Sequence, residues 1–307
     1  MKITLQILIA YALVLTPFPL AADEAQVSRR QKVYKTVGEV QLKANIYELE
    51  KSQARKRPAI VFFFGGGWRS GSVNQFRYQS EYLARQGMVA IVPDYRVYNR
   101  QMASVVDCVS DAKSAIRWVR ANARQLGIDP QRIAAGGGSA GGHLAAATAL
   151  LPGLDQEGEN RRVSSEPNAL LLFNPALDLR REAFPATFPE TRYKELSSRF
   201  GGPVEIISPQ HHLRPKLPPT IIFHGRADTT IPFATVERFC AATKTHGNRC
   251  QLVGYDNAAH GFFNYGRSGN TAFINTLEHC HTFLAGLGYL EGEPNVKSFV
   301  ASLSKQE

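Results

Sequence analysis

Short, continuously apolar runs alternate with helical segments from about residue 58 to the end of the chain. An apolar run of about four to eight residues is typical of a strand buried on both faces, because an exposed face would carry polar residues at every second position. Strands that alternate with helices predict a parallel sheet with helices on both of its faces, so we expect an α/β fold. The predicted strands are 59–64, 88–92, 132–135, 169–173, 220–223 and 251–255.

The predicted helices lie between these strands or follow the last of them, and 104–126 has the clearest helical spacing of apolar residues, with Gly127 as its stop signal. An alternating segment at 32–47, centred on Gly38, predicts an antiparallel hairpin at the sheet edge. The remaining predicted helices are 76–86, 141–150 and 272–284.

The first 22 residues have the pattern of an export signal. Lys2 precedes an apolar run at 7–15, two prolines end the run, and Ala22 offers a small residue at the expected cleavage site. The run is too short to span a membrane comfortably, although an uncleaved anchor is the alternative. We therefore expect an exported protein, periplasmic or secreted, with no stable membrane insertion after cleavage.

The mature chain, 23–307, is expected to form a single domain, since we find no internal repeat and no second domain boundary. Residues 174–219 are rich in proline and charge and lie between two predicted strands, so they form a lid-like insertion. The sequence does not predict an oligomeric state.

The formal net charge is +10, from 36 Lys and Arg against 26 Asp and Glu. These basic residues are scattered, and the densest cluster, at 55–57, is short and has no interleaved aromatic residues. That pattern is typical of a solvated loop, so no nucleic-acid partner is expected.

Four cysteines remain after the signal, and an exported protein can form disulfides. Cys240 and Cys250 flank a predicted helix-to-strand turn and are the best candidate pair, although four cysteines allow three connectivities. Four buried thiols are the alternative. The spacing of the cysteines does not match a zinc site, and we expect no metal and no cofactor.

Residues 137–141 read Gly-Gly-Ser-Ala-Gly and fit the pattern G-x-S-x-G. The pattern gains weight from its context, because a predicted strand enters it and a predicted helix leaves it, as a nucleophile elbow requires. Ser139 is therefore the candidate nucleophile. A tight turn with an incidental serine is the alternative, and a phosphate-binding loop is disfavoured because the Walker lysine is missing.

A serine hydroxyl needs a general base, and His260 follows the last predicted strand. Asp228, which follows the strand before it, is the candidate acid, and Asp256 is its weaker competitor. The chain order Ser, Asp, His is that of α/β-hydrolases. The glycine run at 65–67 follows a buried strand and, together with the backbone N–H of Ala140, would supply an oxyanion hole.

These motifs resemble the hormone-sensitive-lipase-like and acetyl-esterase branches of the α/β-hydrolases, especially secreted bacterial enzymes related to acetyl-xylan esterases. The similarity covers about residues 30–290, nearly the whole mature chain. It implies an eight-stranded, mostly parallel sheet, and it implies that Gly66, Gly67 and Ala140 are the oxyanion donors. The residues that carry the resemblance are Gly65-Gly66-Gly67-Trp68, Pro93-Asp94-Tyr95-Arg96, Gly138-Ser139-Ala140-Gly141-Gly142-His143, Asp228 and His260-Gly261-Phe262.

The chain departs from the family pattern at one visible position. Phe64 stands before the glycine run, where the family usually has a histidine that supports the loop. The chemistry is expected to survive this change, while the rigidity of the loop is in question.

The expected function is hydrolysis of short-chain carboxylic esters through an acyl-enzyme, with O-acetyl groups of carbohydrates as candidate substrates. The insertion is short for a full lipase cap, which favours an open site. Two alternatives remain open: a serine peptidase of the same fold, and a catalytically silent binding protein on the same scaffold.

Overall fold

The computed structural model describes residues 26–303 except 51, 53 and 55, so the expected signal at 1–22 lies outside the described residues. One sheet of eight strands has the order β1-β2-β4-β3-β5-β6-β7-β8. The strands are β1 (Val27–Val37), β2 (Val40–Leu49), β3 (Arg57–Phe63), β4 (Val89–Pro93), β5 (Ile128–Gly138), β6 (Ala169–Phe173), β7 (Thr220–Gly225) and β8 (Cys250–Tyr255).

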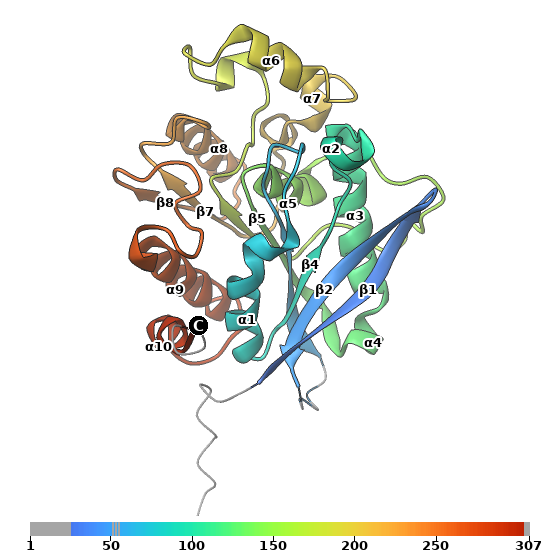
Figure 1. Ribbon diagram of the computed structural model, residues 1–307, viewed down its shortest axis with the longest axis vertical. Helices are drawn as coiled ribbons and strands as arrows, with labels where there is room; N and C mark the ends of the chain where they lie inside the picture. Colours follow the sequence, from blue (N-terminus) through green and yellow to red (C-terminus); the bar gives the residue numbers. More distant parts are fainter. Residues whose placement is uncertain (1–25, 51, 53, 55, 304–307) are drawn as a thin grey trace, which may run out of the picture.

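The sheet is parallel from β4 to β8, and β1 and β2 form an antiparallel hairpin at its edge. The prediction of an eight-stranded, mostly parallel sheet with an N-terminal hairpin is confirmed. Figure 1 shows the hairpin (blue) at one side of the molecule and β7 and β8 at the other.

Helices cover both faces of the sheet (Figure 1). The helices of the described chain are α1 (Arg77–Arg85), α2 (Tyr98–Gln101), α3 (Val105–Ala121), α4 (Ala123–Leu126), α5 (Ala140–Leu150), α6 (Glu190–Ser197), α7 (Val204–Ile207), α8 (Phe233–Thr245), α9 (Thr271–Ala285) and α10 (Val296–Leu303).

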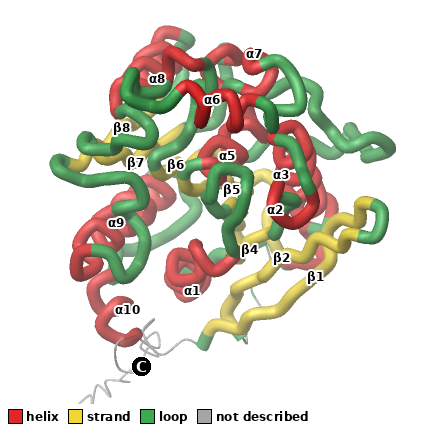
Figure 2. Tube along the Cα trace, turned by 45° about the horizontal axis from the view of Figure 1, so that its top comes forward, coloured by secondary structure: helices red, strands yellow, loops and turns green. Residues whose placement is uncertain are grey.

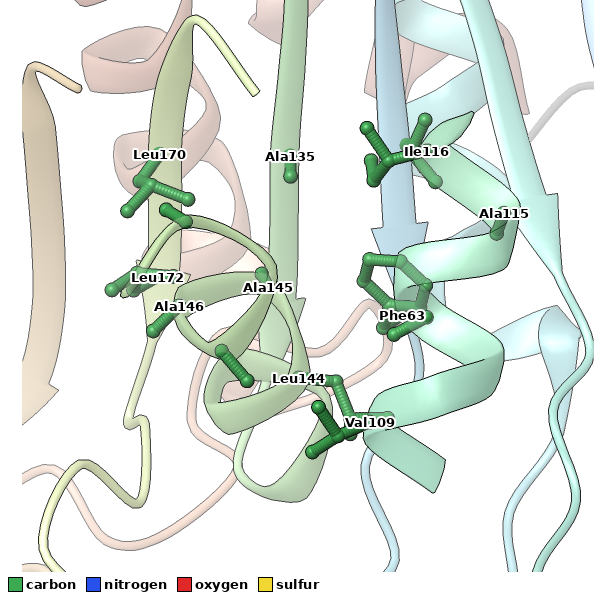
Figure 3. Packing of buried hydrophobic residues seen from close by; sticks show 14 of the residues in the cluster. Phe63, Val109, Ala115, Ile116, Ala135, Leu144, Ala145, Ala146, Leu170 and Leu172 are labelled. Atoms are coloured by element: carbon green, nitrogen blue, oxygen red, sulfur yellow. The ribbon is translucent and has the colours of Figure 1, made fainter. Parts of the chain in front are cut away.

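Two apolar clusters explain why the central strands are apolar at every position. In β3, Val61 and Phe63 pack in the cluster that contains α3, α5 and α8, whereas Ile60 and Phe62 point the other way, into the cluster with α1, α9 and α10. Figure 3 shows the first cluster, with Leu144 of α5 near α3 and the neighbouring strands. Burying both faces removes apolar surface from water, at about 25 cal/mol per Å².

The largest differences from the prediction concern one helix and one strand. The helix predicted at 104–126 is divided into α3 and α4 at Asn122, whose φ of −98° and ψ of 16° interrupt the helical path. The strand predicted at 132–135 extends over 128–138, because Gly137 and Gly138 pair in register with Phe63 and Phe173.

The insertion at 174–219 contains α6 and α7 together with two short 3₁₀ turns, Arg181–Ala183 and Pro209–His212. Figure 1 shows α6 and α7 at the top of the molecule, beyond the layers that flank the sheet. Figure 2, in which the top of the molecule comes forward, again shows α6 and α7 at this end, away from the hairpin of β1 and β2.

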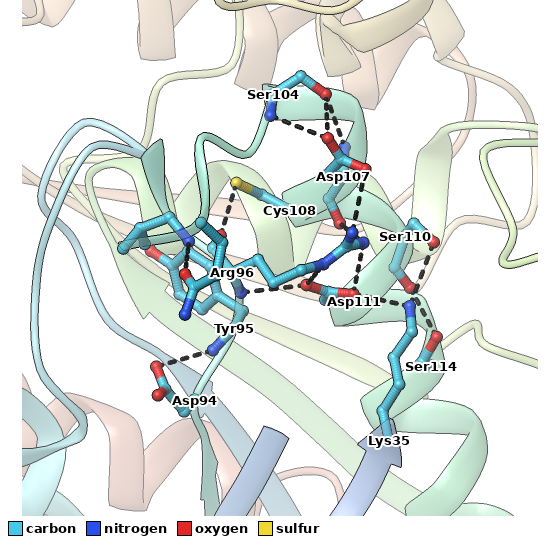
Figure 4. A network of polar contacts seen from close by, with 12 residues as sticks. Lys35, Asp94, Tyr95, Arg96, Ser104, Asp107, Cys108, Ser110, Asp111 and Ser114 are labelled. Carbon is cyan, nitrogen blue, oxygen red and sulfur yellow. Dashed lines mark hydrogen bonds and ion pairs between the residues drawn. The ribbon is translucent and has the colours of Figure 1, made fainter. Parts of the chain in front are cut away.

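A buried ion-pair network ties the hairpin to α3. Asp111 on α3 is fully buried and accepts from Arg96 at 2.8 Å and 2.9 Å and from Lys35 of β1 at 2.7 Å (Figure 4). A buried carboxylate is tolerated only when it is paired in this way. The Asp-Tyr-Arg motif at 94–96 therefore helps to stabilise the fold, through the ion pair of Arg96 with Asp111.

The candidate disulfide between Cys240 and Cys250 is not present: all four cysteines are buried free thiols, which is the alternative that the sequence left open. The two thiols do lie beside one another, close enough for each to shift the pKa of the other. The closeness of the two cysteines in the sequence thus correctly predicted that their side chains are neighbours in the fold. A covalent bond also requires the specific geometry of a disulfide.

No helix within the described parts of the chain is long and apolar enough to cross a membrane.

Candidate active site

Ser139 lies at a sharp turn between β5 and α5, with a φ of 54° and a ψ of −118°. Positive φ is rare for a residue with a side chain and marks backbone strain that the surrounding structure must hold in place. Here the Ser139 N–H donates to the carbonyl of Phe173 at 2.9 Å, and its carbonyl accepts from the N–H of His143 at 3.0 Å. These bonds hold the serine at the end of the strand, half-exposed.

Close backbone packing explains the glycines of the elbow. A Cβ on Gly141 would lie 2.0 Å from the carbonyl oxygen of Phe63, and one on Gly137 would lie 2.4 Å from the backbone of Gly141. Both distances are far below van der Waals contact. The first turn of α5 can therefore approach β3 only where side chains are missing.

Three residues that are distant in the sequence meet at this turn. His260 Nε2 lies 2.9 Å from the Ser139 hydroxyl oxygen, and His260 Nδ1 lies 2.7 Å from Asp228 Oδ2. With Nδ1–H donating to the carboxylate, Nε2 is free to accept the serine proton. The arrangement has the connectivity of a Ser-His-Asp triad.

Asp228 is buried at the end of β7 and is held by the backbone. Its Oδ1 accepts from the N–H groups of Thr230 at 2.8 Å and Ile231 at 2.9 Å. Burial pushes the pKa of Asp228 upward, but hydrogen bonds from His260 and the Ile231 N–H outweigh burial and hold the pKa below its ordinary value. The carboxylate is therefore ionised at neutral pH.

The competing acid Asp256 and the neighbouring His224 have different surroundings from the residues of this triad. Asp256, the competing acid, is exposed and pairs with Arg226 at 3.1 Å, so Asp228 is the carboxylate beside His260. His224 is fully buried, and its Nε2 donates to the carbonyl of Ile231 at 2.9 Å. Burial lowers the pKa of His224, which packs as a neutral side chain.

The glycine loop lies directly against the elbow. Gly66 and Gly67 have φ values of 128° and 61°, and a Cβ on Gly65 would lie 2.8 Å from the carbonyl oxygen of Gly138. Ala140 is the first residue of α5, so its N–H has no acceptor within the helix. The three predicted oxyanion donors thus lie on the two backbone segments that border Ser139.

The side chains of Tyr95 and Gln75 hold the start of the glycine loop, where the family usually has a histidine. Phe64 is fully buried, and its ring stacks on Tyr95 with centroids 4.2 Å apart. The Tyr95 hydroxyl donates to the carbonyl of Phe64 at 2.7 Å, and Gln75 Oε1 accepts from the Gly65 N–H at 2.6 Å. The peptide group between Phe64 and Gly65 is therefore held at both its carbonyl and its N–H.

His143 packs under the same loop. Trp68 Nε1 donates to His143 Nδ1 at 3.2 Å, and His143 Nε2 donates to the carbonyl of Ile207 at 2.6 Å. A second proton on Nδ1 would face the Trp68 N–H, and the ring has no exposure to water. Burial lowers the pKa of His143 from 6.5 to about 4.

This burial predicts a measurable acid sensitivity. Between pH 6.5 and 4 the unfolded chain protonates His143 while the folded chain does not, so stability falls as pH falls. From pH 7 to pH 4.5 we expect wild type to lose about 2 kcal/mol more unfolding free energy than His143→Gln. Urea unfolding at both pH values measures the difference, with His246→Gln, at an exposed position, as the control. Equal losses in wild type and His143→Gln would contradict the assignment of a neutral buried His143.

Ser139 and His260 open into a cavity of about 490 Å³. One wall is apolar and includes Phe184, Phe188 and Leu196 of the insertion. The predicted lid-like segment thus contributes directly to the cavity wall. This combination of an apolar wall and a few convergent polar groups is typical of a small-molecule site.

Sequence reasoning missed several residues around the cavity. Asn174 Oδ1 accepts from the Gly261 N–H at 3.0 Å, and Gln75 Nε2 donates to Asn264 at 3.1 Å, linking the glycine loop to the loop of His260. Arginines of the insertion also line the cavity. No motif marks these positions, because each depends on contacts between distant segments.

Solved structures with about half of their residues identical share this fold. Thermogutta terrifontis esterase 2 phosphoramylated by tabun is 52% identical with a TM-score of 0.81, and the match covers 86% of this chain and 97% of that chain. The butyrate-bound structure of this thermophilic esterase is 51% identical with a TM-score of 0.80, covering 89% and 98%.

A curated relative is more distant. The probable isoprenylcysteine alpha-carbonyl methylesterase ICMEL1 of Arabidopsis thaliana is 28% identical over 225 residues, 69% of this chain and 47% of that protein. The chain thus spans about half the length of this relative.

The fold, the elbow and these neighbours define an α/β-hydrolase of the serine-esterase class, in the hormone-sensitive-lipase-like branch. The BD-FAE family model matches residues 44–242, and the chain belongs to the BD-FAE family.

Proposed function

We propose that the protein hydrolyses short-chain carboxylic esters by acyl transfer through Ser139, His260 and Asp228. The observation that carries the proposal is the continuous hydrogen-bonded chain from the Ser139 hydroxyl through His260 to the buried Asp228, at 2.9 Å and 2.7 Å. A base within this distance makes a serine hydroxyl nucleophilic.

In the first step, His260 Nε2 takes the hydroxyl proton as Ser139 attacks the ester carbonyl. The carbonyl oxygen becomes an oxyanion, and the backbone N–H groups of Gly66, Gly67 and Ala140 stabilise it. The imidazolium then gives its proton to the leaving alcohol, which departs and leaves an acyl-enzyme.

In the second step, water attacks the acyl-enzyme while His260 again acts as the base, and the carboxylic acid is released. Asp228 stays ionised and holds the proton of His260 on Nδ1, which agrees with the lowered pKa of its carboxyl group. This scheme uses no metal and no cofactor.

The acyl group is expected to be short, with acetyl groups on carbohydrates as the leading natural candidates. One observation supports a short acyl chain: the related Thermogutta esterase has been solved with propionate and with butyrate bound. We also propose that residues 1–22 direct export, which would bring the enzyme to extracellular or periplasmic esters.

A p-nitrophenyl ester series from acetate to palmitate tests the proposal. We expect kcat/KM to be highest for acetate to butyrate and to fall at least tenfold by octanoate, as a site selective for short acyl groups requires. A parallel comparison of O-acetylated glycans with long-chain triglycerides extends the test to natural substrates. A preference for palmitate and for triglycerides would overturn the short-acyl assignment.

A further inference from the structure

Four arginines line the cavity that contains Ser139. Arg69 follows the glycine loop, Arg192 lies on α6, Arg199 follows α6, and Arg267 lies on the loop after His260. Glu195 is the one carboxylate among the described lining residues. The lining therefore has an excess of three positive charges, brought together from three separate segments.

Most of this charge is not neutralised. Arg69 pairs with Glu195 at 3.4 Å, and both side chains are more than half exposed. Within the described chain, no carboxylate lies within ion-pair distance of Arg192, Arg199 or Arg267.

Several structural arginines elsewhere in the fold are paired with carboxylates. Arg57, Arg96 and Arg117, which are structural, each have a carboxylate oxygen within 2.8 Å. The cavity is thus a place where guanidinium groups gather without protein anions, and a ligand anion would supply the missing partner.

Arg199 is the half-buried member of this group. Its Nη1 lies 3.4 Å from the carbonyl oxygen of Gly67, and its guanidinium carbon lies over the Tyr98 ring, 5.4 Å from the ring centroid. These contacts place the positive charge beside the loop proposed to bind the oxyanion. A group held by Arg199 would therefore lie close to the reacting ester.

We propose that the preferred substrates are esters whose alcohol part carries a carboxylate, bound by Arg192, Arg199 and Arg267. This inference rests on the proposed ester hydrolysis and on its short acyl group, which leaves the alcohol part as the bearer of the charge. Guanidinium binds carboxylate by two parallel hydrogen bonds, and a cavity lined by one sign of charge concentrates the opposite ion. The apolar wall of Phe184 and Phe188 would pack against a ring or alkyl portion of the same alcohol.

Two esters of nearly equal shape test the charge preference: 4-acetoxybenzoate and 4-acetoxybenzamide. The enzymatic kcat/KM of each ester is divided by the rate constant of its alkaline hydrolysis, which corrects for its intrinsic reactivity. We expect wild type to favour the carboxylate, with a kcat/KM ratio of about ten at low ionic strength that declines as salt is added. Arg192→Gln, Arg199→Gln and Arg267→Gln should each lower the ratio about two- to fivefold.

Two further variants guard against general damage to the site. Glu195→Gln removes the carboxylate of the lining and should raise the ratio, which a merely disruptive change would not do. Lys194→Gln removes a charge from the same helix at an exposed position outside the cavity lining and should leave the ratio unchanged.

The outcomes distinguish a failure of the anion site from a failure of the proposed ester hydrolysis. If wild type hydrolyses the carboxamide ester but shows no preference for the carboxylate, or if the arginine variants keep the wild-type ratio, the anion site is wrong and the esterase stands. If neither ester is hydrolysed, the proposed function fails and the substrate class fails with it.

Discussion

Ser139→Ala is expected to lower kcat/KM for p-nitrophenyl acetate by about 10⁴-fold or more, because the acyl-enzyme can no longer form. The residual rate would come from substrate binding and from the backbone donors of the oxyanion hole, which the variant retains. Initial rates of the two purified proteins under identical conditions give the ratio directly.

The variant should fold as wild type does. Alanine removes only the hydroxyl oxygen at residue 139, and the backbone bonds to Phe173 and His143 that hold the strained turn remain. Ser70→Ala, at an exposed position outside the cavity lining, is the matched control and should keep full activity. An unfolding midpoint close to that of wild type would show that the lost activity is chemical.

A serine-reactive phosphonate adds a readout that does not depend on the choice of substrate. We expect stoichiometric labelling of wild type and no labelling of Ser139→Ala. An unlabelled wild type would favour a silent binding protein, and turnover of amides above esters would favour the peptidase. Undiminished ester hydrolysis by Ser139→Ala would refute the nucleophile assignment.

The sequence predicted the sheet well for an identifiable physical reason. Strands such as β6 are buried on both faces, so all of their residues are apolar, and that pattern is visible without any knowledge of tertiary contacts. The candidate site was also predictable from the sequence, because Ser139, Asp228 and His260 each follow a predicted strand. Parallel strands bring the residues that follow them to one edge of the sheet.

Features that depend on tertiary context were not predictable in the same way. Apolar periodicity runs through Asn122, since α4 faces the same core as α3, so it does not reveal the break between them. The glycines of β5 indicated a turn by propensity, yet Gly137 pairs as part of the strand. The position requires glycine because its neighbours leave no room for a side chain. The arginines of the insertion entered no motif at all.

Gly141→Ala is expected to cause the largest loss of stability among single-methyl substitutions at the elbow. Its Cβ would lie 2.0 Å from the Phe63 oxygen and 2.5 Å from the Phe64 oxygen, and both contacts are with backbone that cannot rotate away. Overpacking lowers the unfolding free energy by about 1–3 kcal/mol in ordinary cores. A clash with backbone atoms should cost at least the upper value of this range, because backbone cannot rotate away as a side chain can. We expect a loss of about 3 kcal/mol or more, measured by urea unfolding.

Gly286→Ala is the matched control. It adds the same methyl group next to α9 at a φ of −64°, with neighbours at ordinary distances of 3.4 Å and 3.6 Å. Its unfolding free energy should stay within about 1 kcal/mol of wild type. Equal stability of the two variants would mean that the contact between α5 and β3 is looser than the structure shows.

Gly141→Ala also links the fold to the chemistry. The atoms that must move to admit the methyl group belong to Phe63 and Phe64, which lead directly into the glycine loop. Any Gly141→Ala protein that does fold is therefore expected to have a displaced oxyanion loop and a lower kcat for p-nitrophenyl acetate, because the donors no longer meet the developing charge. A folded Gly141→Ala protein with wild-type kcat would show that the loop keeps its position independently of the elbow.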